Sequence, residues 1–527
     1  MFRVVLWLVI VGLVGRRLVV ARPSLPPPVG ANASLLQTAL DRICAEDNGG
    51  HLTIKAGTYV FSNTSLEITD CRHISVHGDG AILLFYIGFG IAIKNCDNVT
   101  VQGLTLDSDP PNYAQGRVTR VDAHTASFTS TFDEAFLMPD TSAVPFNAPG
   151  GSAGAKIMFW KADTRLPSRQ VHFLKSSTPA HGVHSWQIEV KDGLSSPLPK
   201  TGDLVTVFPR RGFTWLSHNS SGVVADSIVI HAGGNMGFLE TMGDGGHVYR
   251  NVSIVRKPGS RGLMALNADG FHSLGVRVGP TLENSEISFT GDDHLNIHAS
   301  MLLVCKGLTP TQLAIVDPSD QIMVPGDTLS FYKLLSSMPG HPPGRLNPFL
   351  AKAVVKDIRK ATDPSLVQDC QHASTFMGQP PYNAWLIVST LGSPVYVVDV
   401  ETPPGPSVTS TRYSLVSLDS HLCANAKVRN NYFHDSCGSG GRILLKSRNA
   451  TFEKNVAERF GGIHITTEQE WLEGDLGIGN IVLDSNFIED QDGFLTHVDV
   501  MPGVANVTCE NTSFVEHGKT THRSEGC

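Results

Sequence analysis

A short phrase, an Asn or Asp followed by a stretch of alternating apolar residues, returns along much of this 527-residue chain. Within each of two groups, neighbouring phrases begin 24 to 33 residues apart, which is the period of a solenoid protein. Each coil would supply about three short strands, and stacking would bury an apolar column that no single coil could bury. The repeat therefore predicts an all-β solenoid. The phrases begin at Asp226, Asn251 and Asn284, and again at Asn431, Asn455, Asn486 and Asn511.

The residue that opens each phrase is suited to a turn between strands, because Asn and Asp bond local backbone and tolerate positive φ. The composition agrees with many short strands: Gly accounts for 51 residues and charged residues for only 17% of the chain. A β-sandwich would also contain many short strands, so the periodicity alone leaves that alternative open.

Two stretches interrupt the repeat, at residues 108–218 and 300–422. Both lose the Asn-strand phrase and contain alternating segments and Pro-rich loops. We therefore predict two antiparallel β-modules inserted between coils, which makes the solenoid one discontinuous domain. Its parts are residues 22–107 with an N-terminal cap, 219–299 with an acidic cluster described below, and 423–527.

The N-terminal region holds a predicted targeting segment and one helix. Residues 1–21 contain an apolar run and end with Val19 and Ala21 in the small-residue positions of a secretory signal peptide. Residues 32–44 have the periodicity of an amphipathic helix, which would cap the first coil. No later segment has the length of a membrane-spanning helix, so we expect no membrane insertion.

Sequons, cysteines and charge agree with a secreted glycoprotein. Nine Cys residues are compatible with three or four disulfides and a leftover thiol. The net charge of −8, without a Lys/Arg run, argues against binding to nucleic acid or to an anionic membrane. We expect the protein to be secreted and N-glycosylated. The eight Asn-x-Ser/Thr sequons begin at Asn32, Asn63, Asn98, Asn219, Asn251, Asn449, Asn506 and Asn511.

Three aspartates stand one repeat apart. Asp269 precedes Asp292 by 23 residues and Asp293 by 24, and coils of that period would stack the three on one wall, with equivalent positions about 4.8 Å apart. Glycosidases use such pairs: carboxyl groups lie about 6.5–9.5 Å apart in inverting enzymes and about 5–5.5 Å apart in retaining ones. A Gly-Asp-Asp segment is also ordinary turn chemistry, so a purely structural interpretation stays open.

Geometry and charge constrain this predicted cluster. Successive strand residues point to opposite faces, so Asp292 and Asp293 can both reach the wall only if Gly291 or a bulge breaks the strand. Three carboxyl groups this close cannot all ionise easily. At least one should carry a proton near neutral pH, as a general acid requires.

Polar residues beside the cluster are candidates for bonding sugar hydroxyls, and one Trp offers a flat apolar face for a sugar ring. Each also has a structural alternative, as a turn residue or as packing between coils. A Cys-His nucleophile pair, a phosphate-binding Gly-rich loop and a Cys-x-x-Cys pair are missing from the sequence, so we predict neither cofactor nor metal. The candidates are Asn267, His272, His294, Asn296 and Trp471.

Three segments resemble glycoside hydrolase family 110, the α-1,3-galactosidases. They are Asn267-Ala-Asp-Gly-Phe-His272, Thr290-Gly-Asp-Asp-His-Leu-Asn-Ile-His298, and Leu106-Asp-Ser-Asp-Pro110 followed by Gln115-Gly-Arg-Val118. The resemblance spans nearly the whole mature chain and implies a right-handed parallel β-helix with inserted β-barrel modules. It also implies exo-cleavage of terminal α-1,3-linked galactose from a glycan, with inversion and without metal. The catalytic acids and bases would be Asp269, Asp292 and Asp293, in roles that stay open.

The chain departs from this family and from a second one. Pro111-Asn-Tyr-Ala114 stands where the galactosidases tend to carry apolar and aromatic residues, which leaves substrate preference open. Polygalacturonases share the β-helix and an Asp triad, but here Arg442 and Lys446 have a different spacing and a Gly-His-Gly element is missing. Another β-helix glycosidase and a non-catalytic glycan-binding protein therefore remain as alternatives.

Overall fold

The computed structural model describes most of the chain from residue 31 onward. The predicted signal segment, residues 1–21, and Trp471 lie outside the described residues. The described residues are 31–46, 49–86, 88–133, 155–191, 194, 198–317, 323–333, 348–371, 393–409, 414–436, 441–468, 473–474, 477–489, 498–516 and 519–523.

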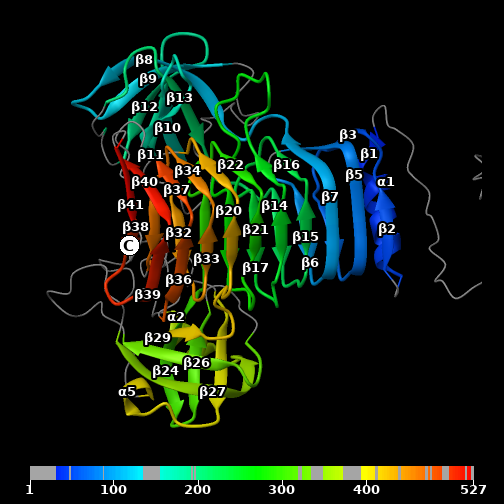
Figure 1. Ribbon diagram of the computed structural model, residues 1–527, viewed down its shortest axis with the longest axis vertical. Helices are drawn as coiled ribbons and strands as arrows, with labels where there is room; N and C mark the ends of the chain where they lie inside the picture. The colour runs from blue at the N-terminus through cyan, green and yellow to red at the C-terminus, as the bar shows by residue number, and fades with distance from the viewer. Residues whose placement is uncertain are drawn as a thin grey trace, which may run out of the picture.

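The fold is a right-handed parallel β-helix with two inserted antiparallel barrels, which confirms the predicted fold class (Figure 1). One wall is a 9-stranded parallel sheet, and the candidate site lies on this wall. Its strands are β4 (Leu66–Thr69), β6 (Ile91–Lys94), β14 (Trp215–His218), β17 (Phe238–Thr241), β20 (Phe271–Leu274), β23 (Leu295–His298), β32 (Ile443–Lys446), β35 (Ile463–Ile465) and β38 (Val498–Val500).

The remaining walls form one 20-stranded sheet, in which most coils contribute two consecutive strands separated by a corner. Its strands are β1 (Ala31–Asn32), β2 (Gly50–Thr53), β3 (Gly57–Phe61), β5 (Arg72–Phe85), β7 (Asp97–Ser108), β15 (Val224–Asp226), β16 (Val229–Ile230), β18 (Val248–Arg250), β19 (Ser253–Ile254), β21 (Thr281–Glu283), β22 (Glu286–Ser288), β30 (Lys427–Arg429), β31 (Tyr432–His434), β33 (Thr451–Glu453), β34 (Val456–Glu458), β36 (Gly479–Asp484), β37 (Phe487–Glu489), β39 (Ala505–Glu510), β40 (Thr512–Glu516) and β41 (Lys519–Arg523).

Both insertions are closed six-stranded barrels, and Figure 1 shows them at opposite ends of the strands of the 9-stranded sheet. The first barrel leads into the start of β14, and the second follows the end of β23. The boundary expected at residue 218 lies beyond this barrel, because β14 already pairs with β6 and β17. The first barrel comprises β8 (Ala114–Asp122), β9 (Ser127–Phe132), β10 (Lys156–Trp160), β11 (Pro167–Pro179), β12 (Ser185–Val190) and β13 (Leu204–Phe208). The second comprises β24 (Met301–Thr309), β25 (Gln312–Val316), β26 (Thr328–Lys333), β27 (Phe349–Lys360), β28 (Val395–Val400) and β29 (Ser414–Leu418).

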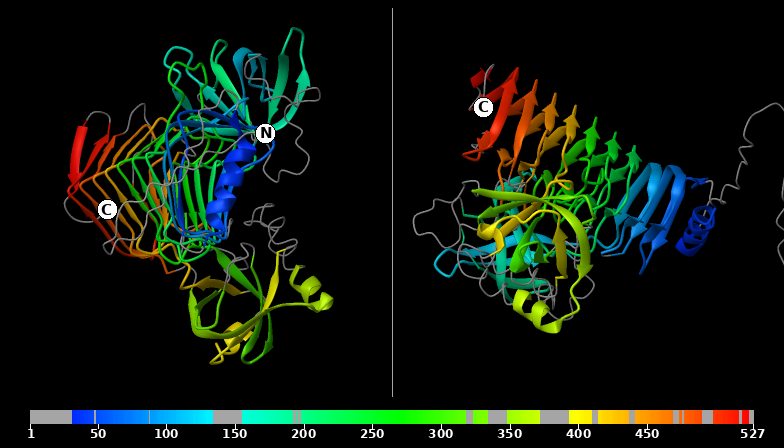
Figure 2. Two further views of the ribbon diagram at one scale, coloured as in Figure 1. Left: turned by 90° about the vertical axis from the view of Figure 1, so that its right-hand side faces the viewer. Right: turned by 90° about the horizontal axis from the view of Figure 1, so that it is seen from below.

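The helix α1 (Ala33–Cys44) covers the N-terminal end of the solenoid, as Figure 2 shows. It buries Leu36, Leu40 and Ile43 against the first coils, so the predicted cap is present. Two short helices, α2 (Pro364–Gln371) and α5 (Pro406–Thr409), belong to the second insertion. None of the described helices is both long and apolar enough to cross a membrane.

Disulfides join two pairs of described cysteines. Cys44 at the end of α1 is bonded to Cys71, and Cys305 on β24 is bonded to Cys370 on α2. Each bond ties a helix to a neighbouring strand or turn. Cys96 and Cys423 are buried free thiols, so the described residues contain two unpaired cysteines where the sequence predicted one leftover thiol.

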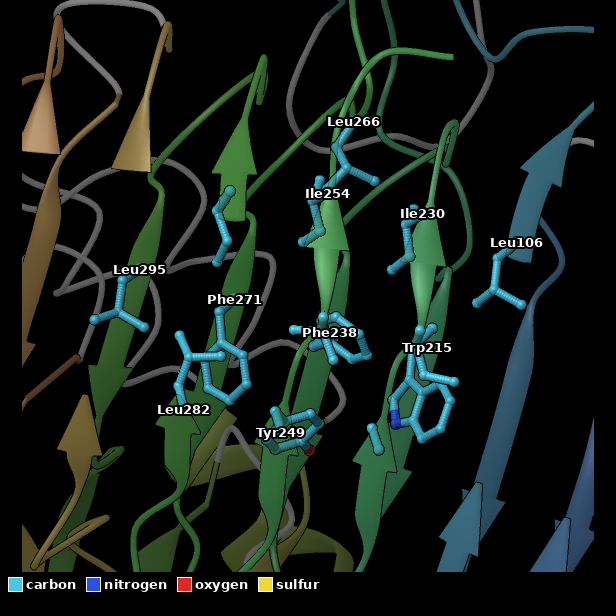
Figure 3. Close-up of a cluster of buried hydrophobic side chains, with 14 of the residues drawn as sticks. Leu106, Trp215, Ile230, Phe238, Tyr249, Ile254, Leu266, Phe271, Leu282 and Leu295 are labelled. Carbon is cyan, nitrogen blue, oxygen red and sulfur yellow. The ribbon is translucent and has the colours of Figure 1, made fainter. Parts of the chain in front are cut away.

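The core is built from rows of inward side chains in register between coils. Trp215, Phe238, Phe271 and Leu295 form one such row, and each is fully buried (Figure 3). Burying a large apolar side chain stabilises a protein by about 1.5–3 kcal/mol. Because every coil repeats this contribution, the column is continuous.

The repeated Asn residues take two different places. Asn251 and Asn284 are corner residues with φ of 54° and 53°, the turn role expected from the sequence. In a later coil the corner residue is Lys454, with φ of 54°, and Asn455 beside it points into the core. The repeated sequence phrase therefore locates this corner, but the residue with positive φ is the one before the Asn.

Buried Asn side chains form a ladder through three coils. The backbone N–H and side-chain Nδ2 of Asn431 both donate to Oδ1 of Asn455 at 3.0 Å. Asn455 repeats the pattern with Asn486, at 3.0 and 3.2 Å. The ladder satisfies backbone donors at a corner where the strand hydrogen bonds are interrupted.

Replacing Asn455 by Ala should lower the free energy of unfolding by about 2–4 kcal/mol, because buried donors of Asn431 lose their acceptor and each costs about 1–3 kcal/mol. Urea unfolding would measure this. The control Lys427→Ala changes an exposed residue of β30 and should stay within about 0.5 kcal/mol of the wild type. Equal midpoints for the two variants would show that the ladder contributes nothing.

Candidate active site

The outward face of the 9-stranded sheet presents polar side chains in register. His272 on β20 lies opposite Asn296 on β23, and His298 on β23 lies opposite Lys446 on β32. The turn before β20 carries Asp269, and the turn before β23 carries the two adjacent aspartates. Strand register thus places polar residues from three coils on one surface.

The three aspartates meet, as their spacing predicts. One carboxylate oxygen from each of Asp269, Asp292 and Asp293 lies within 4.8 Å of the other two. The chain between β22 and β23 is irregular, and a Cβ at Gly291 would lie 2.7 Å from the carbonyl oxygen of Asn267. This interruption lets both neighbouring aspartates approach the same point.

Asp292 is the most exposed member of the cluster, with 17% of its side chain accessible against 5% for Asp269 and 6% for Asp293. Its Oδ2 accepts a hydrogen bond from Lys156 Nζ at 2.6 Å and also contacts Arg210. Lys156 begins β10 of the first barrel, and Arg210 follows β13. The first insertion therefore supplies two cations that pair with Asp292.

Asp293 is buried against one arginine. Its Oδ1 accepts from Arg442 Nε at 3.1 Å and from the Arg442 backbone N–H at 3.2 Å. Burial raises the pKa of Asp293 to about 7; the charge of Arg442 opposes this shift, whereas the charges of Asp269 and Glu468 add to it. Asp293 is therefore the member of the cluster suited to carry a proton near neutral pH.

Asp269 has a different environment. Its Oδ2 lies 2.6 Å from His272 Nδ1, and His272 Nε2 lies 2.9 Å from His298 Nε2. Burial alone would raise the pKa of Asp269, but the hydrogen bond and charge of His272, with the charge of Arg210, hold it below its ordinary value. The ionised form is thus favoured for Asp269 and the protonated form for Asp293.

The histidine tautomers follow from these contacts. Burial lowers the pKa of His298 to about 4, so this ring is neutral near pH 7. Its Nδ1 donates to the carbonyl oxygen of Ala299 at 2.8 Å, which leaves Nε2 as an acceptor. His272 must therefore donate from Nε2, and its hydrogen bond to the Asp269 carboxylate requires that Nδ1 donates as well.

A second group of charges lies beside the aspartates. Lys446 is fully buried, and its Nζ donates to Glu468 Oε2 at 2.5 Å and to Glu473 Oε2 at 2.6 Å. Arg442 Nη1 donates to the other oxygen of Glu468 at 3.0 Å. Burial opposes ionisation of Glu473, but the charge of Lys446 holds its pKa well below the ordinary value.

The polar residues predicted to bind sugar have distinct positions. Asn267 is fully buried, and its Nδ2 donates to the carbonyl oxygens of Asn112 and Pro209, which fixes both ends of the first insertion. His294 is also fully buried, with its nitrogens facing the carbonyl oxygens of Gly441 and His434. The Nδ2 of Asn267 and the ring of His294 thus contact backbone, whereas the Oδ1 of Asn267 is buried without a hydrogen-bond partner among the described residues.

The other predicted sugar ligands are closer to the cluster. His272 contacts Asp269 directly, and Asn296 donates from Nδ2 to Glu473 Oε2 at 3.3 Å. The Oδ1 of Asn296 is buried and has no hydrogen-bond partner in the described part of the chain. Trp471, the predicted stacking residue, lies outside the described residues.

Sequence reasoning missed four charged residues of this site, Lys156, Arg210, Glu468 and Glu473. It noticed Arg442 and Lys446 only as a mismatch to another family. Their spacing was nevertheless a usable signal. Arg442 directly precedes β32 and Lys446 is its last residue, and strand residues separated by an even number of positions lie on the same face.

Clusters of three carboxylates can bind a cation. Here Asp292 already contacts Lys156 and Arg210, and Asp293 contacts Arg442. A divalent cation would have to displace these side chains or accept their repulsion. The residues therefore do not fit a metal site.

No family model matches this sequence, and no curated protein matches it. Three solved structures align over most of the chain with low similarity. One described as a glycoside hydrolase has 9% identity and a TM-score of 0.34, covering 92% of this chain and 89% of that one. The tailspike protein gp49 of Pseudomonas phage LKA1 has 11% identity and a TM-score of 0.29, with 91% and 56% covered. Iota-carrageenase in complex with iota-carrageenan fragments has 10% identity and a TM-score of 0.19, with 95% of both chains covered. These similarities do not place the chain in a family.

The raised pKa of Asp293 predicts a pH dependence of stability. Below the ordinary value of 3.8, Asp293 is protonated in both the folded and the unfolded states. As pH rises from there through about 7, only the folded state keeps the proton, so the stabilisation is progressively lost. Asp293→Asn removes this effect, so wild-type stability should fall relative to the variant between about pH 4 and about pH 7.

Urea unfolding at several pH values would measure the difference. Asp499→Asn, an exposed position on β38 of the same sheet, is the matched control and should give a curve parallel to the wild type. If the Asp293→Asn curve were also parallel, Asp293 would not be the group that holds a proton in the folded state.

Proposed function

We propose that this protein is a glycoside hydrolase that removes terminal α-1,3-linked galactose from glycans by acid/base catalysis. The observation that carries the proposal is the difference between adjacent carboxyl groups: Asp293 has its pKa raised to about 7, and Asp269 has its pKa lowered. Glycoside hydrolysis requires this division between a protonated and an ionised carboxyl group. The sugar and the linkage come from the motif resemblance described above.

The environments suggest a role for each aspartate. Asp293 donates its proton to the glycosidic oxygen as the bond to the galactose C1 breaks. A water molecule attacks C1, and its proton passes to an ionised carboxylate, either Asp269 or Asp292. Asp292 is accessible and pairs with the cations Lys156 and Arg210, so it also suits a carboxylate that contacts the sugar.

His272 and Asn296 are proposed to assist from the same face of the sheet. His272 keeps Asp269 ionised and oriented. Asn296 has a buried, unpartnered Oδ1 that suits a sugar hydroxyl donor. Asn267 and His294 are assigned to holding the backbone around the cluster, because Asn267 Nδ2 and the ring nitrogens of His294 already contact backbone carbonyl oxygens there.

Inversion is proposed from the resemblance. One oxygen from each of the three carboxyl groups lies within 4.8 Å of the others, which is an upper limit on their closest approach. It is shorter than the separation of about 6.5–9.5 Å typical of inverting enzymes and close to the 5–5.5 Å of retaining ones. The anomer released first distinguishes the two.

Proton NMR of the purified protein with Gal-α1,3-Gal should show β-galactose before α-galactose. Asp269→Asn, Asp292→Asn and Asp293→Asn should each lower kcat/KM by about 10²–10⁴-fold, the usual contribution of acid/base groups. Asp499→Asn should leave it unchanged. Early α-galactose would replace inversion by retention. No release from a panel of α-galactosides would contradict the hydrolase and favour a glycan-binding protein.

The leaving group should separate the acid from the base. An aryl α-galactoside with a good leaving group needs little protonation, so Asp293→Asn should retain far more of its wild-type rate on this substrate than on the disaccharide. Variants of Asp269 or Asp292 that remove the base should lose activity on both substrates. Steady-state rates on the two substrates measure this. Equal losses for Asp293→Asn on both would remove it from the acid role.

A further inference from the structure

The side chain of Arg442 is divided between two carboxyl groups. Its Nε donates to Asp293 at 3.1 Å, whereas its Nη1 donates to Glu468 at 3.0 Å. The remaining contact to Asp293, from Nη2, is longer at 3.4 Å. An arginine that faced Asp293 alone could make two short parallel hydrogen bonds and would hold it firmly as a carboxylate.

Glu468 cannot turn away from this arrangement. Its second oxygen accepts from the buried Lys446, and Lys446 also bonds Glu473. The backbones of Glu468 and Glu473 exchange two hydrogen bonds, at 2.9 and 3.1 Å. The competition for Arg442 is therefore a fixed property of the fold.

Charge counting identifies the group that should hold a proton. Asp293, Arg442, Glu468, Lys446 and Glu473 form a connected row of three carboxyl groups and two cations. With all three carboxyl groups ionised the row carries a net negative charge, and one proton makes it neutral. Lys446 contacts both glutamates, so Asp293, which has only part of Arg442, is the member that keeps the proton.

Other charged groups also face Asp293. Asp269 and Asp292 lie within 4.8 Å by their nearest oxygens. Asp269 is partnered by His272, and Asp292 by Lys156 and Arg210. Each of these carboxylates thus has its own cationic or hydrogen-bonding partner, and neither contacts Arg442 in the described part of the chain.

We propose that Glu468 is a positioning residue for this reaction: by holding part of Arg442, it keeps Asp293 supplied with the proton that is transferred to the glycosidic oxygen. The proposal rests on the proposed function, in which Asp293 is the acid. It assigns a role to a residue that lies 26 positions after Arg442 in the sequence and need not touch the substrate.

The test is the pH dependence of kcat/KM on Gal-α1,3-Gal for Glu468→Gln. Without the competing carboxylate, Arg442 can turn fully to Asp293, so Asp293 should lose its proton at lower pH. The basic limb of the profile should move down by about one pH unit, a tenfold change in proton affinity. Glu468→Asp, which keeps the charge, should restore much of the wild-type profile.

Glu283→Gln is the matched control, because Glu283 also pairs with an arginine, Arg429, but lies on the 20-stranded sheet. It should leave the profile unchanged. A Glu468→Gln variant with lower kcat and an unmoved basic limb would reduce Glu468 to a structural role and overturn the proposal.

Unfolding measurements keep this test separate from that of the function. The pH-dependent stability difference between wild type and Asp293→Asn should move to lower pH when both carry Glu468→Gln. If that shift occurs in a protein that releases no galactose, the charge arrangement stands and the proposed function fails. If galactose is released but neither the profile nor the stability difference moves, the function stands and the role of Glu468 fails.

Discussion

Backbone register between successive coils is the constraint on which this structure depends. Parallel hydrogen bonding aligns Phe238 with Phe271 and Phe271 with Leu295 in the interior. The same alignment places His272 opposite Asn296 on the outside. Since side chains alternate along a strand, a shift by one residue in any coil would expose the apolar row and bury the polar one. The same strand register thus determines both the apolar core and the polar site.

The sequence predicted what the repeat controls. The solenoid, the interruption of the repeat by two modules and the meeting of the three aspartates all follow from local spacing. The charged partners did not follow, because Lys156 reaches Asp292 across 136 residues, out of a barrel whose position the repeat does not encode. Asn267 shows that proximity in sequence can also mislead. It neighbours the cluster in sequence, but its side chain bonds the backbone of the first insertion.

The sequons illustrate how one pattern can have two origins. Six of the eight begin with an Asn at positive φ on a solenoid corner, and typically a buried small or apolar residue follows before a more accessible Ser or Thr. A coil corner favours that order of residues for conformational reasons, so it produces Asn-x-Ser/Thr without reference to glycosylation. Their number therefore weighs less as a sign of the secretory pathway than the sequence alone implied. The six are Asn98, Asn219, Asn251, Asn449, Asn506 and Asn511.

The first barrel has a consequence for how a protein with this architecture can diversify. It enters between two coils without breaking their register, and it places Lys156 on the most accessible aspartate. Changes in the barrel can alter what approaches the cluster while the coils that set the spacing of the carboxyl groups stay as they are. A new binding preference would then need only the exchange of an insertion, with the carboxyl cluster inherited unchanged from the scaffold beneath it.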